Sequence, residues 1–293
     1  MDVALAVDIG GTKLAAGLVT DGGEVVARRT VPTPAGHDGE LLWARLAALV
    51  GAVVAGAPSG VRAVVCGVGS GGPMTPGGGE VSPLNIPAWR DFPLRARLRA
   101  ATGLPTHIDN DAKALALGEG WRGAASGATD FVAMVVSTGV GGGIVLDGRL
   151  LDGAGGNAGH IGHVIVVPDG GRTCGCGARG CLEAEASGTA IAAATGAPPA
   201  EAADPVRRRT GTLVGRAVAS VANLLDLPLA VVAGSVALGY GEVFFGAAQA
   251  EIDARCRLEF AQGTRIVPAG LGAAGPLVGA AAVGWRGAGH TLA

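Results

Sequence analysis

Charged residues are scarce in this sequence, and neither sign dominates. Only 16% of its 293 residues are charged, and 22 basic residues are balanced by 24 acidic ones, which gives a net charge of −2. Nucleic-acid binding needs a basic surface, so this composition argues against a nucleic-acid partner. The hydrophobic share of 49% allows a large buried core, which excludes extended disorder.

A membrane-spanning segment and an export signal are also missing. The longest apolar stretch, residues 41–57, is short for a span and carries Arg45, so we expect a buried helix there. Met1-Asp2 leads directly into an apolar segment, without the basic region that opens a signal peptide. We therefore expect a cytoplasmic protein that does not enter the membrane.

Two common nucleotide-binding motifs are absent in their functional context. No G-x-x-x-x-G-K-S/T run occurs, which excludes a P-loop. Residues 67–73 formally contain G-x-G-x-x-G, but Pro73 and the residues after it do not begin a helix. That fingerprint needs a strand followed directly by a helix, so a nicotinamide-binding fold is not expected.

A strand-rich opening with a glycine-rich first turn occurs twice in the chain. Duplicated lobes of this kind normally hold a ligand in the cleft between them. In the first copy we expect strands at 3–8, 14–20, 24–31 and 61–68, and a helix at 41–57 that Asp38 can cap. In the second we expect strands at 131–136, 143–147, 163–167 and 229–233, and helices at 183–194, 212–226 and 241–257. The lobes are predicted to join near Pro105–Asn110, and a C-terminal helix is predicted at 271–284.

Both glycine-rich turns have the chemistry of a phosphate site. In the first, Asp8–Lys13, glycine N–H groups, a Thr hydroxyl and a Lys ammonium can bind an anion, while Asp8 can hold a water of Mg²⁺. The second, Ser137–Gly143, has two hydroxyls and four glycines. Either turn alone could be an ordinary hairpin. Two such turns, each after the first strand of its lobe, favour phosphate binding.

A third motif, Ile108-Asp109-Asn110-Asp111-Ala112, precedes a helical segment at 113–119. An Asp at the start of a helix is often its N-cap, so cap and general base are equal alternatives for Asp111 on this motif alone. The two phosphate turns on either side of the motif favour the general base.

The five cysteines do not indicate a disulfide framework, because the chain shows no export signal. Three of them, Cys174, Cys176 and Cys181, lie close together downstream of His163. Three thiolates and one imidazole make a closed tetrahedral Cys₃His site, which suits a structural zinc ion.

Together these motifs resemble the ROK family of sugar kinases and repressors over about Val3 to Val283. The matching motifs are Asp8–Lys13, Asn110-Asp111, Ser137–Gly143, Gly162-His163, Cys174–Cys181 with Leu182-Glu183, and Ala233-Gly234-Ser235. The resemblance implies an α/β, two-lobed, actin-like (ribonuclease-H-like) ATPase fold with a small zinc loop. It implies a small N-terminal lobe at 1–108, joined by the C-terminal helix at about 275–293, and a larger lobe at 109–274 with the zinc loop at 163–181.

The same resemblance implies a role for each matching residue. Asp111 would be the base that activates a sugar hydroxyl, at the 6-position, for attack on ATP. The residues that hold ATP and Mg²⁺ would be Asp8, Gly10, Gly11, Thr12, Lys13, Thr138, Gly139 and Gly234. The residues that line the sugar pocket would be Asn85, Asn110, His160, His163 and Glu183. The zinc ligands would be His163, Cys174, Cys176 and Cys181. A homodimer is implied as well.

His160 departs from the glucokinase pattern. Glucokinase-type members read Gly-Glu-x-Gly-His, whereas this chain reads Gly-His-Ile-Gly-His at 159–163. A carboxylate accepts from two hydroxyls at once, but a neutral imidazole offers one acceptor and one donor, so the contacts near ring positions 1 and 2 should differ. The motif looks more like bacterial N-acetylmannosamine kinases. Glucose, an amino sugar such as kanosamine and a C7-cyclitol remain alternatives, as does a substitution without effect on the substrate.

Non-enzymatic members of the family are the remaining alternative. Its repressors carry a DNA-binding winged helix of about 70–80 residues before the first motif. Here Asp8 lies close to the first residue and no basic recognition helix precedes it, which argues against a repressor. A sugar sensor without a DNA-binding domain is opposed by the presence of Asp111 and both phosphate turns.

Overall fold

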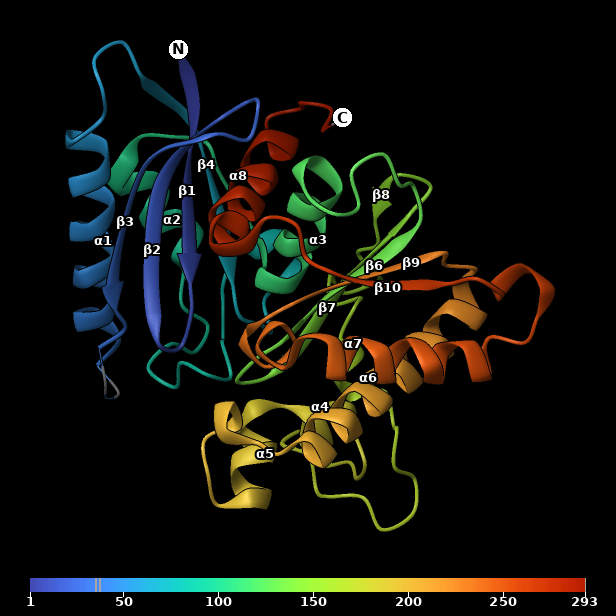
Figure 1. Ribbon diagram of the computed structural model, residues 1–293. Helices are drawn as coiled ribbons and strands as arrows, with labels where there is room; N and C mark the ends of the chain where they lie inside the picture. Colours follow the sequence, from blue (N-terminus) through green and yellow to red (C-terminus); the bar gives the residue numbers. More distant parts are fainter. Residues whose placement is uncertain (35, 37, 293) are drawn as a thin grey trace. The chain divides into compact units, whose positions relative to one another are not determined.

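The computed structural model describes residues 1–34, 36 and 38–292, and it divides into two compact units. The first unit comprises Met1–Gly127, Asp152–Ala158 and Leu271–Ala293. The second comprises Ala128–Leu151 and Gly159–Gly270. Both units are mixed α/β structures built on a five-stranded sheet, which confirms the predicted fold class (Figure 1).

The sheet of the first unit has the strand order β3-β2-β1-β4-β5. Strands β1 (Asp2–Ile9), β2 (Lys13–Thr20) and β3 (Val25–Pro32) form an antiparallel meander. Strands β4 (Arg62–Ser70) and β5 (Thr106–Asn110) then continue the sheet parallel to β1. The three parallel strands therefore end at the same edge.

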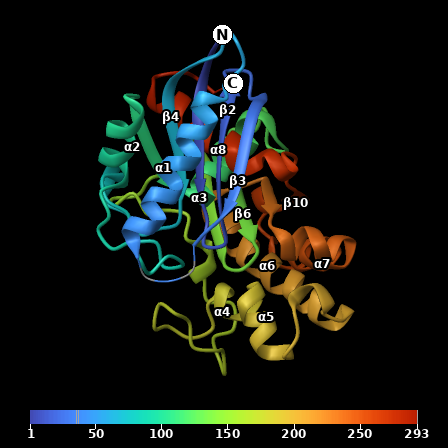
Figure 2. The same ribbon diagram turned by 90° about the vertical axis from the view of Figure 1, so that its left-hand side faces the viewer.

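Helices cover both faces of this sheet (Figures 1 and 2). On one face α1 (Gly39–Ala55) and α2 (Leu94–Thr102) pack on the larger apolar side chains of β1, such as Leu5 and Val7. On the other face α3 (Asp111–Arg122) and α8 (Gly275–Gly287) pack on its alanines. Because side chains of a strand alternate between faces, the β1 sequence Val-Ala-Leu-Ala-Val determines this arrangement.

Helix α8 lies unusually close to the sheet, because small residues line the contact. A Cβ atom at Gly67 of β4 would overlap the carbonyl oxygen of Ala280 in α8. The end of α3 is tied to the start of this C-terminal segment by Glu119, a fully buried carboxylate that accepts from the Ala124 and Leu271 N–H groups at 2.8 and 3.1 Å. These contacts hold α3 and α8 in one unit.

The sheet of the second unit has the strand order β10-β9-β6-β7-β8. Its strands are β6 (Phe131–Val136), β7 (Val140–Leu146), β8 (Arg149–Leu150), β9 (Leu229–Ala233) and β10 (Arg265–Pro268). The first three form an antiparallel meander, and β9 and β10 run parallel to β6. The opening of the first unit is thus repeated in a second sheet.

The helices of the second unit are α4 (Leu182–Ala186), α5 (Gly188–Thr195), α6 (Asp204–Leu225) and α7 (Ser235–Arg255). Glycines on α6 let it pack tightly on α7, because a Cβ at Gly211 or Gly215 would overlap the α7 backbone. Short 3₁₀ turns occur in the two units at Pro76–Gly78, Ile161–His163, Pro199–Glu201, Glu259–Ala261 and Gly272–Ala274.

Several predicted elements differ from the structure. The strand predicted at 163–167 is wrong: this segment starts in the 3₁₀ turn Ile161–His163 and makes only an isolated bridge between Ile165 and Cys181. The helix predicted at 183–194 is interrupted at Ser187, whose hydroxyl caps α5 by accepting from the Ala190 N–H. Helices α6 and α7 begin before the predicted starts at 212 and 241.

The first unit extends past residue 108, the predicted end of the N-terminal lobe, to Gly127. Helix α3 lies in this stretch and packs on β4 and α8. The lobe boundaries themselves stay a prediction. Of the helices in the described residues, none is long and apolar enough to cross a membrane.

Candidate active site and metal cluster

The carboxyl ends of β1, β4 and β5 bring together three acidic residues of the first unit, Asp8, Asp109 and Asp111. In the sheet register Asp8 is paired with Gly69, and Gly69 is paired with Asp109. Asn110 ends β5, and Asp111 follows it as the first residue of α3. Ligands of parallel α/β sheets bind at such strand ends. Two of the motifs singled out in the sequence, Asp8–Lys13 and Asn110-Asp111, therefore meet at one sheet edge.

The turn between β1 and β2 is an exposed hairpin with open backbone. The Gly10 N–H donates to the Lys13 carbonyl at 3.0 Å, and the Thr33 hydroxyl donates to the Gly10 carbonyl at 2.7 Å. Gly11, Thr12 and Lys13 are exposed. The turn thus offers a hydroxyl, an ammonium and glycine backbone to an anion, as its sequence predicted.

Asp8 is held in an environment that disfavours its charge. Burial, together with the nearby Asp111 carboxylate, raises the pKa of Asp8 to about 7, and Lys13 opposes this rise. A carboxylate so destabilised gains from a cation, because added positive charge relieves both the desolvation and the repulsion. The pair Asp8 and Asp111 is therefore suited to a site that receives a divalent metal.

Asn110 takes the capping role that was an alternative for Asp111. The Asn110 side chain is the N-cap of α3 and accepts from the Ala112 N–H at 3.0 Å. Asp111 is the first helical residue, and one of its oxygens also accepts from the Ala112 N–H, at 2.8 Å. With a separate cap present, the helix does not need Asp111 as its N-cap, which favours the general-base alternative.

The glycine run that follows β4 has a role that its sequence motif did not indicate. A Cβ at Gly71 would lie 3.0 Å from Asn85 Oδ1, and a Cβ at Gly72 would lie 3.3 Å from Asn110 Nδ2. On its other side Asn85 contacts Gly11, where a Cβ would lie 3.2 Å from Asn85 Nδ2. The glycine run is not a dinucleotide loop. It makes room for the two asparagines predicted to line the sugar, and its position after a central parallel strand was the available signal.

The second unit has its own hairpin at the corresponding strand end. Its turn connects β6 to β7, with the Ser137 N–H donating to the Gly139 carbonyl at 2.9 Å. The Thr138 carbonyl accepts from the Thr189 hydroxyl at 3.0 Å, which ties the turn to the start of α5. The predicted phosphate residues Thr138 and Gly139 are thus in a braced, glycine-containing turn.

Gly234 lies beside this turn, at the N-cap of α7. Its φ is 102°, and a Cβ there would overlap the Val136 carbonyl, so only glycine fits. The neighbouring Ser235 hydroxyl is 2.9 Å from the Ser137 hydroxyl. The structure therefore brings Gly234 to the second hairpin, because β9 pairs in parallel with β6.

Glu183 and His160 have different surroundings. The Glu183 carboxylate accepts from the Val140 N–H at 2.9 Å, directly behind the second hairpin. His160 is exposed, and its ring lies nearly parallel to that of His163, with 6.1 Å between centroids. Both residues were predicted to line the sugar; the structure brings His160 beside His163 and attaches Glu183 to the hairpin between β6 and β7.

His163, Cys174, Cys176 and Cys181 form the predicted ligand cluster. Their ligand atoms all lie within 4.8 Å of one another. His163 Nδ1 is 3.7 Å from Cys174 Sγ, and the Sγ atoms of Cys176 and Cys181 are 3.7 Å apart. Tetrahedral zinc with Zn–S bonds of about 2.3 Å separates its ligand atoms by about 3.8 Å, so the donor set fits that ion.

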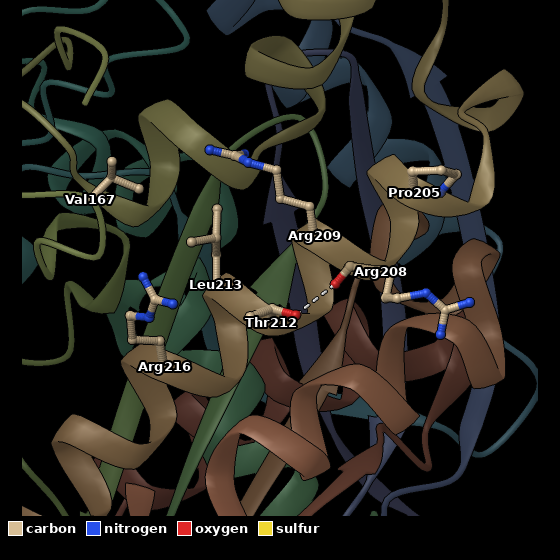
Figure 3. Close-up of a pocket in the computed structure, with 7 residues that line it drawn as sticks. All are labelled: Val167, Pro205, Arg208, Arg209, Thr212, Leu213 and Arg216. Atoms are coloured by element: carbon tan, nitrogen blue, oxygen red, sulfur yellow. Dashed lines mark hydrogen bonds between the residues drawn. The ribbon is translucent and has the colours of Figure 1, made fainter. Parts of the chain in front are cut away.

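The loop that carries these ligands is anchored to α6 by two arginines. Arg209 donates to the buried Glu185 of α4 at 2.7 Å, and Arg216 donates to the Val166 carbonyl at 2.9 Å. A surface pocket of about 600 Å³ lies along this part of α6 (Figure 3). In this view the Arg208 side chain points away from Arg209 and Arg216. Arg209 and Arg216 are each paired with a glutamate. The pocket therefore does not present a cluster of available cations, and these two arginines serve to hold the loop.

Comparison with known proteins places these residues in a family. The model of the ROK family matches residues 4–285. An N-acetylmannosamine kinase of Escherichia fergusonii is 41% identical over 252 residues, which cover 81% of this chain and 84% of that protein. The chain therefore belongs to the ROK family, as its motifs indicated.

Two solved structures resemble this one over nearly their whole length. One is a ROK family glucokinase from Streptomyces griseus in complex with glucose and AMPPNP, with a TM-score of 0.81, 31% identity and coverage of 97% of this chain and 99% of that one. The other is a ROK hexokinase from Thermus thermophilus, with a TM-score of 0.81, 35% identity and coverage of 98% and 99%.

The raised pKa of Asp8 predicts that its charge destabilises the folded protein. Because this pKa rises from 3.8 to about 7 on folding, the folded state holds a proton that the unfolded state has lost, and stability falls as pH rises through this window. We expect Asp8→Asn to raise the melting temperature by a few degrees at pH 8 and by much less at pH 5. Thermal unfolding at both pH values measures this.

The matched control is Asp21→Asn, in the exposed turn after β2. It should shift the melting temperature little at either pH. A stabilisation by Asp8→Asn that is larger at pH 5 than at pH 8 would contradict the assigned cause.

Proposed function

We propose that this chain transfers the γ-phosphoryl group of ATP to the 6-hydroxyl of a hexose or hexose-like sugar, with Asp111 as general base. The observation that carries the proposal is the position of Asp111 at the carboxyl ends of the parallel strands, next to the Asp8–Lys13 hairpin. Membership of the ROK family and the kinase relatives support the reaction class. A sugar-sensing regulator without catalysis is less well supported, since these relatives are named as kinases.

Phosphoryl transfer needs alignment and charge neutralisation more than covalent help from the protein. Mg²⁺ bound to ATP would neutralise phosphate charge, and Asp8 would hold a water of that ion. The hairpin residues Gly10, Gly11, Thr12 and Lys13 would bind phosphate oxygens, and Thr138, Gly139 and Gly234 would also bind the nucleotide. Asp111 would accept the proton of the sugar hydroxyl as its oxygen attacks.

The sugar would be bound by Asn85, Asn110, His160, His163 and Glu183. His160 stands where glucokinase-type members have glutamate, so we propose that it redirects selection at carbon 2 towards N-acetylmannosamine. Plain glucose, an amino sugar such as kanosamine and a C7-cyclitol are the alternatives to be tested. A homodimer, which rests on the family alone, and a cytoplasmic location, which rests on the sequence, are also proposed.

The Cys₃His cluster would hold a structural Zn²⁺. Burial and the neighbouring sulfurs raise the pKa of Cys181 in the absence of a cation, so the crowded thiols gain from a metal that stabilises thiolates. Four protein ligands leave no open position, so the ion would shape the loop and orient His163 rather than take part in the reaction.

The general-base assignment predicts that Asp111→Asn abolishes turnover while ATP still binds. Removal of the base should lower kcat by about 10²-fold or more, because the carboxamide cannot accept the proton. Sugar-dependent ADP release gives kcat, and calorimetry gives the affinity for ATP. The control is again Asp21→Asn, which should retain full activity, and near-normal turnover of Asp111→Asn would refute the role.

The zinc assignment predicts about one zinc per chain in protein purified without chelator. Cys176→Ser should lose most of this zinc and lower the melting temperature, because the exposed Cys176 is a ligand but not part of the core. Cys256→Ser, at a buried cysteine outside the cluster, should retain the zinc. Elemental analysis and thermal unfolding test both, and full zinc in Cys176→Ser would contradict the ligand set.

The role of His160 predicts a change of sugar preference when the glucokinase-type residue is introduced. His160→Glu should raise kcat/KM for glucose relative to N-acetylmannosamine by roughly tenfold, since a carboxylate accepts from two adjacent hydroxyls. The panel is glucose, mannose, N-acetylmannosamine, glucosamine, kanosamine and a valiolone-type cyclitol. A wild-type preference for glucose that His160→Glu leaves unchanged would end this hypothesis.

A further inference from the structure

Lys113 is a buried cation two residues after the proposed base. Only 2% of its side chain is exposed. Its ammonium contacts Asp109 Oδ1 at 3.0 Å, Asp152 Oδ1 at 2.7 Å and the Gly156 carbonyl at 3.2 Å. An ammonium has three N–H donors, so each has an acceptor here. The site is therefore a completed hydrogen-bonding arrangement rather than a chance contact.

Two of these three acceptors belong to one short loop, Asp152–Ala158. The loop is closed by the Ala158 N–H, which donates to the Asp152 carbonyl at 3.0 Å. Asp152 is also 3.7 Å from Arg286 of α8. Lys113 and Arg286 together attach this loop to two helices of the first unit.

The chain runs from this loop directly into the segment that contains His160. The backbone leaves the second unit at Leu151, passes through the loop in the first unit, and re-enters the second unit at Gly159. His160 follows immediately. The residue proposed to select the sugar is therefore two positions from a loop whose anchor is a lysine of α3.

The third acceptor leads to the proposed base. Asp109 Oδ1, which contacts Lys113, also accepts from the Asn110 N–H at 2.8 Å. Asn110 caps α3, and Asp111 is the first residue of that helix. One ammonium thus fixes the strand end before Asp111 and the loop before His160.

Breaking this arrangement leaves polar groups without partners. The Asp109 side chain is only 17% exposed, and burial raises its pKa while Lys113 lowers it. Without the ammonium, Asp109 loses its compensating charge and the loop loses two of its bonds. Asp152, which is 55% exposed, can then turn to solvent at little cost, so the loop should be released first.

We propose that Lys113 is a positioning residue for the sugar substrate, which acts by holding the loop Asp152–Ala158 and, through it, the segment that begins with His160. This inference rests on the proposed function. It assigns to Lys113 an effect on sugar binding and none on ATP binding, since none of the residues proposed to bind ATP lies in the loop that Lys113 holds or directly contacts the Lys113 ammonium.

The test is the variant Lys113→Met, which keeps the length of the side chain and removes its charge. We expect the KM for the sugar to rise roughly tenfold or more, with the KM for ATP unchanged. The Ala158 amide should also lose protection in hydrogen–deuterium exchange. A lysine with only a structural role would lower the active fraction, and therefore the apparent kcat, without changing either KM.

Two further variants complete the experiment. Asp152→Asn acts on an exposed partner, so it should fold normally and show the same effects in weaker form. Arg97→Met removes the cation of another ion pair in the first unit, Arg97–Glu40, and should leave the KM for the sugar unchanged. Lys113→Arg should restore part of the sugar affinity, because it returns the charge.

The outcomes separate this inference from the proposed function. Wild-type turnover with an unchanged KM for the sugar in both Lys113→Met and Asp152→Asn overturns the inference alone. Should Lys113→Met fail to fold, Asp152→Asn and Lys113→Arg decide the same question. Absence of sugar-dependent ADP release and of sugar binding in the wild type overturns both proposals.

Discussion

The burial of one carboxylate beside another at a sheet edge is the constraint on which the proposed site in the first unit depends. The parallel register of β1, β4 and β5 places Asp8 next to the strand end that leads to Asp111. Burial first, and then the charge of Asp111, destabilise the Asp8 carboxylate and raise its pKa. Such an arrangement costs stability and is retained where a cation or phosphate-bound metal is to be received. Lys13 reduces the cost only in part. The proposed kinase reaction supplies the missing positive charge with its substrate.

A second constraint is the space that this edge needs. Several residues around it are glycines, and at Gly71 and Gly72 a Cβ atom would lie only 3.0 Å from Asn85 Oδ1 and 3.3 Å from Asn110 Nδ2. Behind the edge, Gly67 lets α8 approach the sheet, and the buried carboxylate of Glu119 ties that helical segment to α3. The scarcity of large and charged side chains in the composition thus corresponds to close backbone packing around the site.

Motifs whose chemistry is local could be predicted from the sequence. The two hairpins and the Cys₃His cluster follow from adjacent residues, and the structure brings the members of each together. Features that depend on distant segments could not be predicted. The acceptors of Lys113 are separated from it by up to 43 positions, and nothing in the α3 sequence indicates them. The strand predicted at 163–167 was wrong for a different reason: its backbone pairs within its own loop, where the glycine at 180 packs against Val167, instead of joining the sheet.

Two neighbouring histidines connect the ligand cluster with the proposed sugar site. His163 belongs to the ligand cluster, and the ring of His160 lies nearly parallel to it. An ion that fixes the orientation of His163 therefore also fixes the ring that lies beside His160. The other constraint on His160 is its chain connection to the loop held by Lys113. His160, the residue proposed to select the sugar, thus has the cluster histidine beside its ring and, along its backbone, the loop that Lys113 holds. A glutamate in its place would keep the backbone restraint and lose the neighbouring ring, so the same backbone could present either an imidazole or a carboxylate at the proposed sugar site.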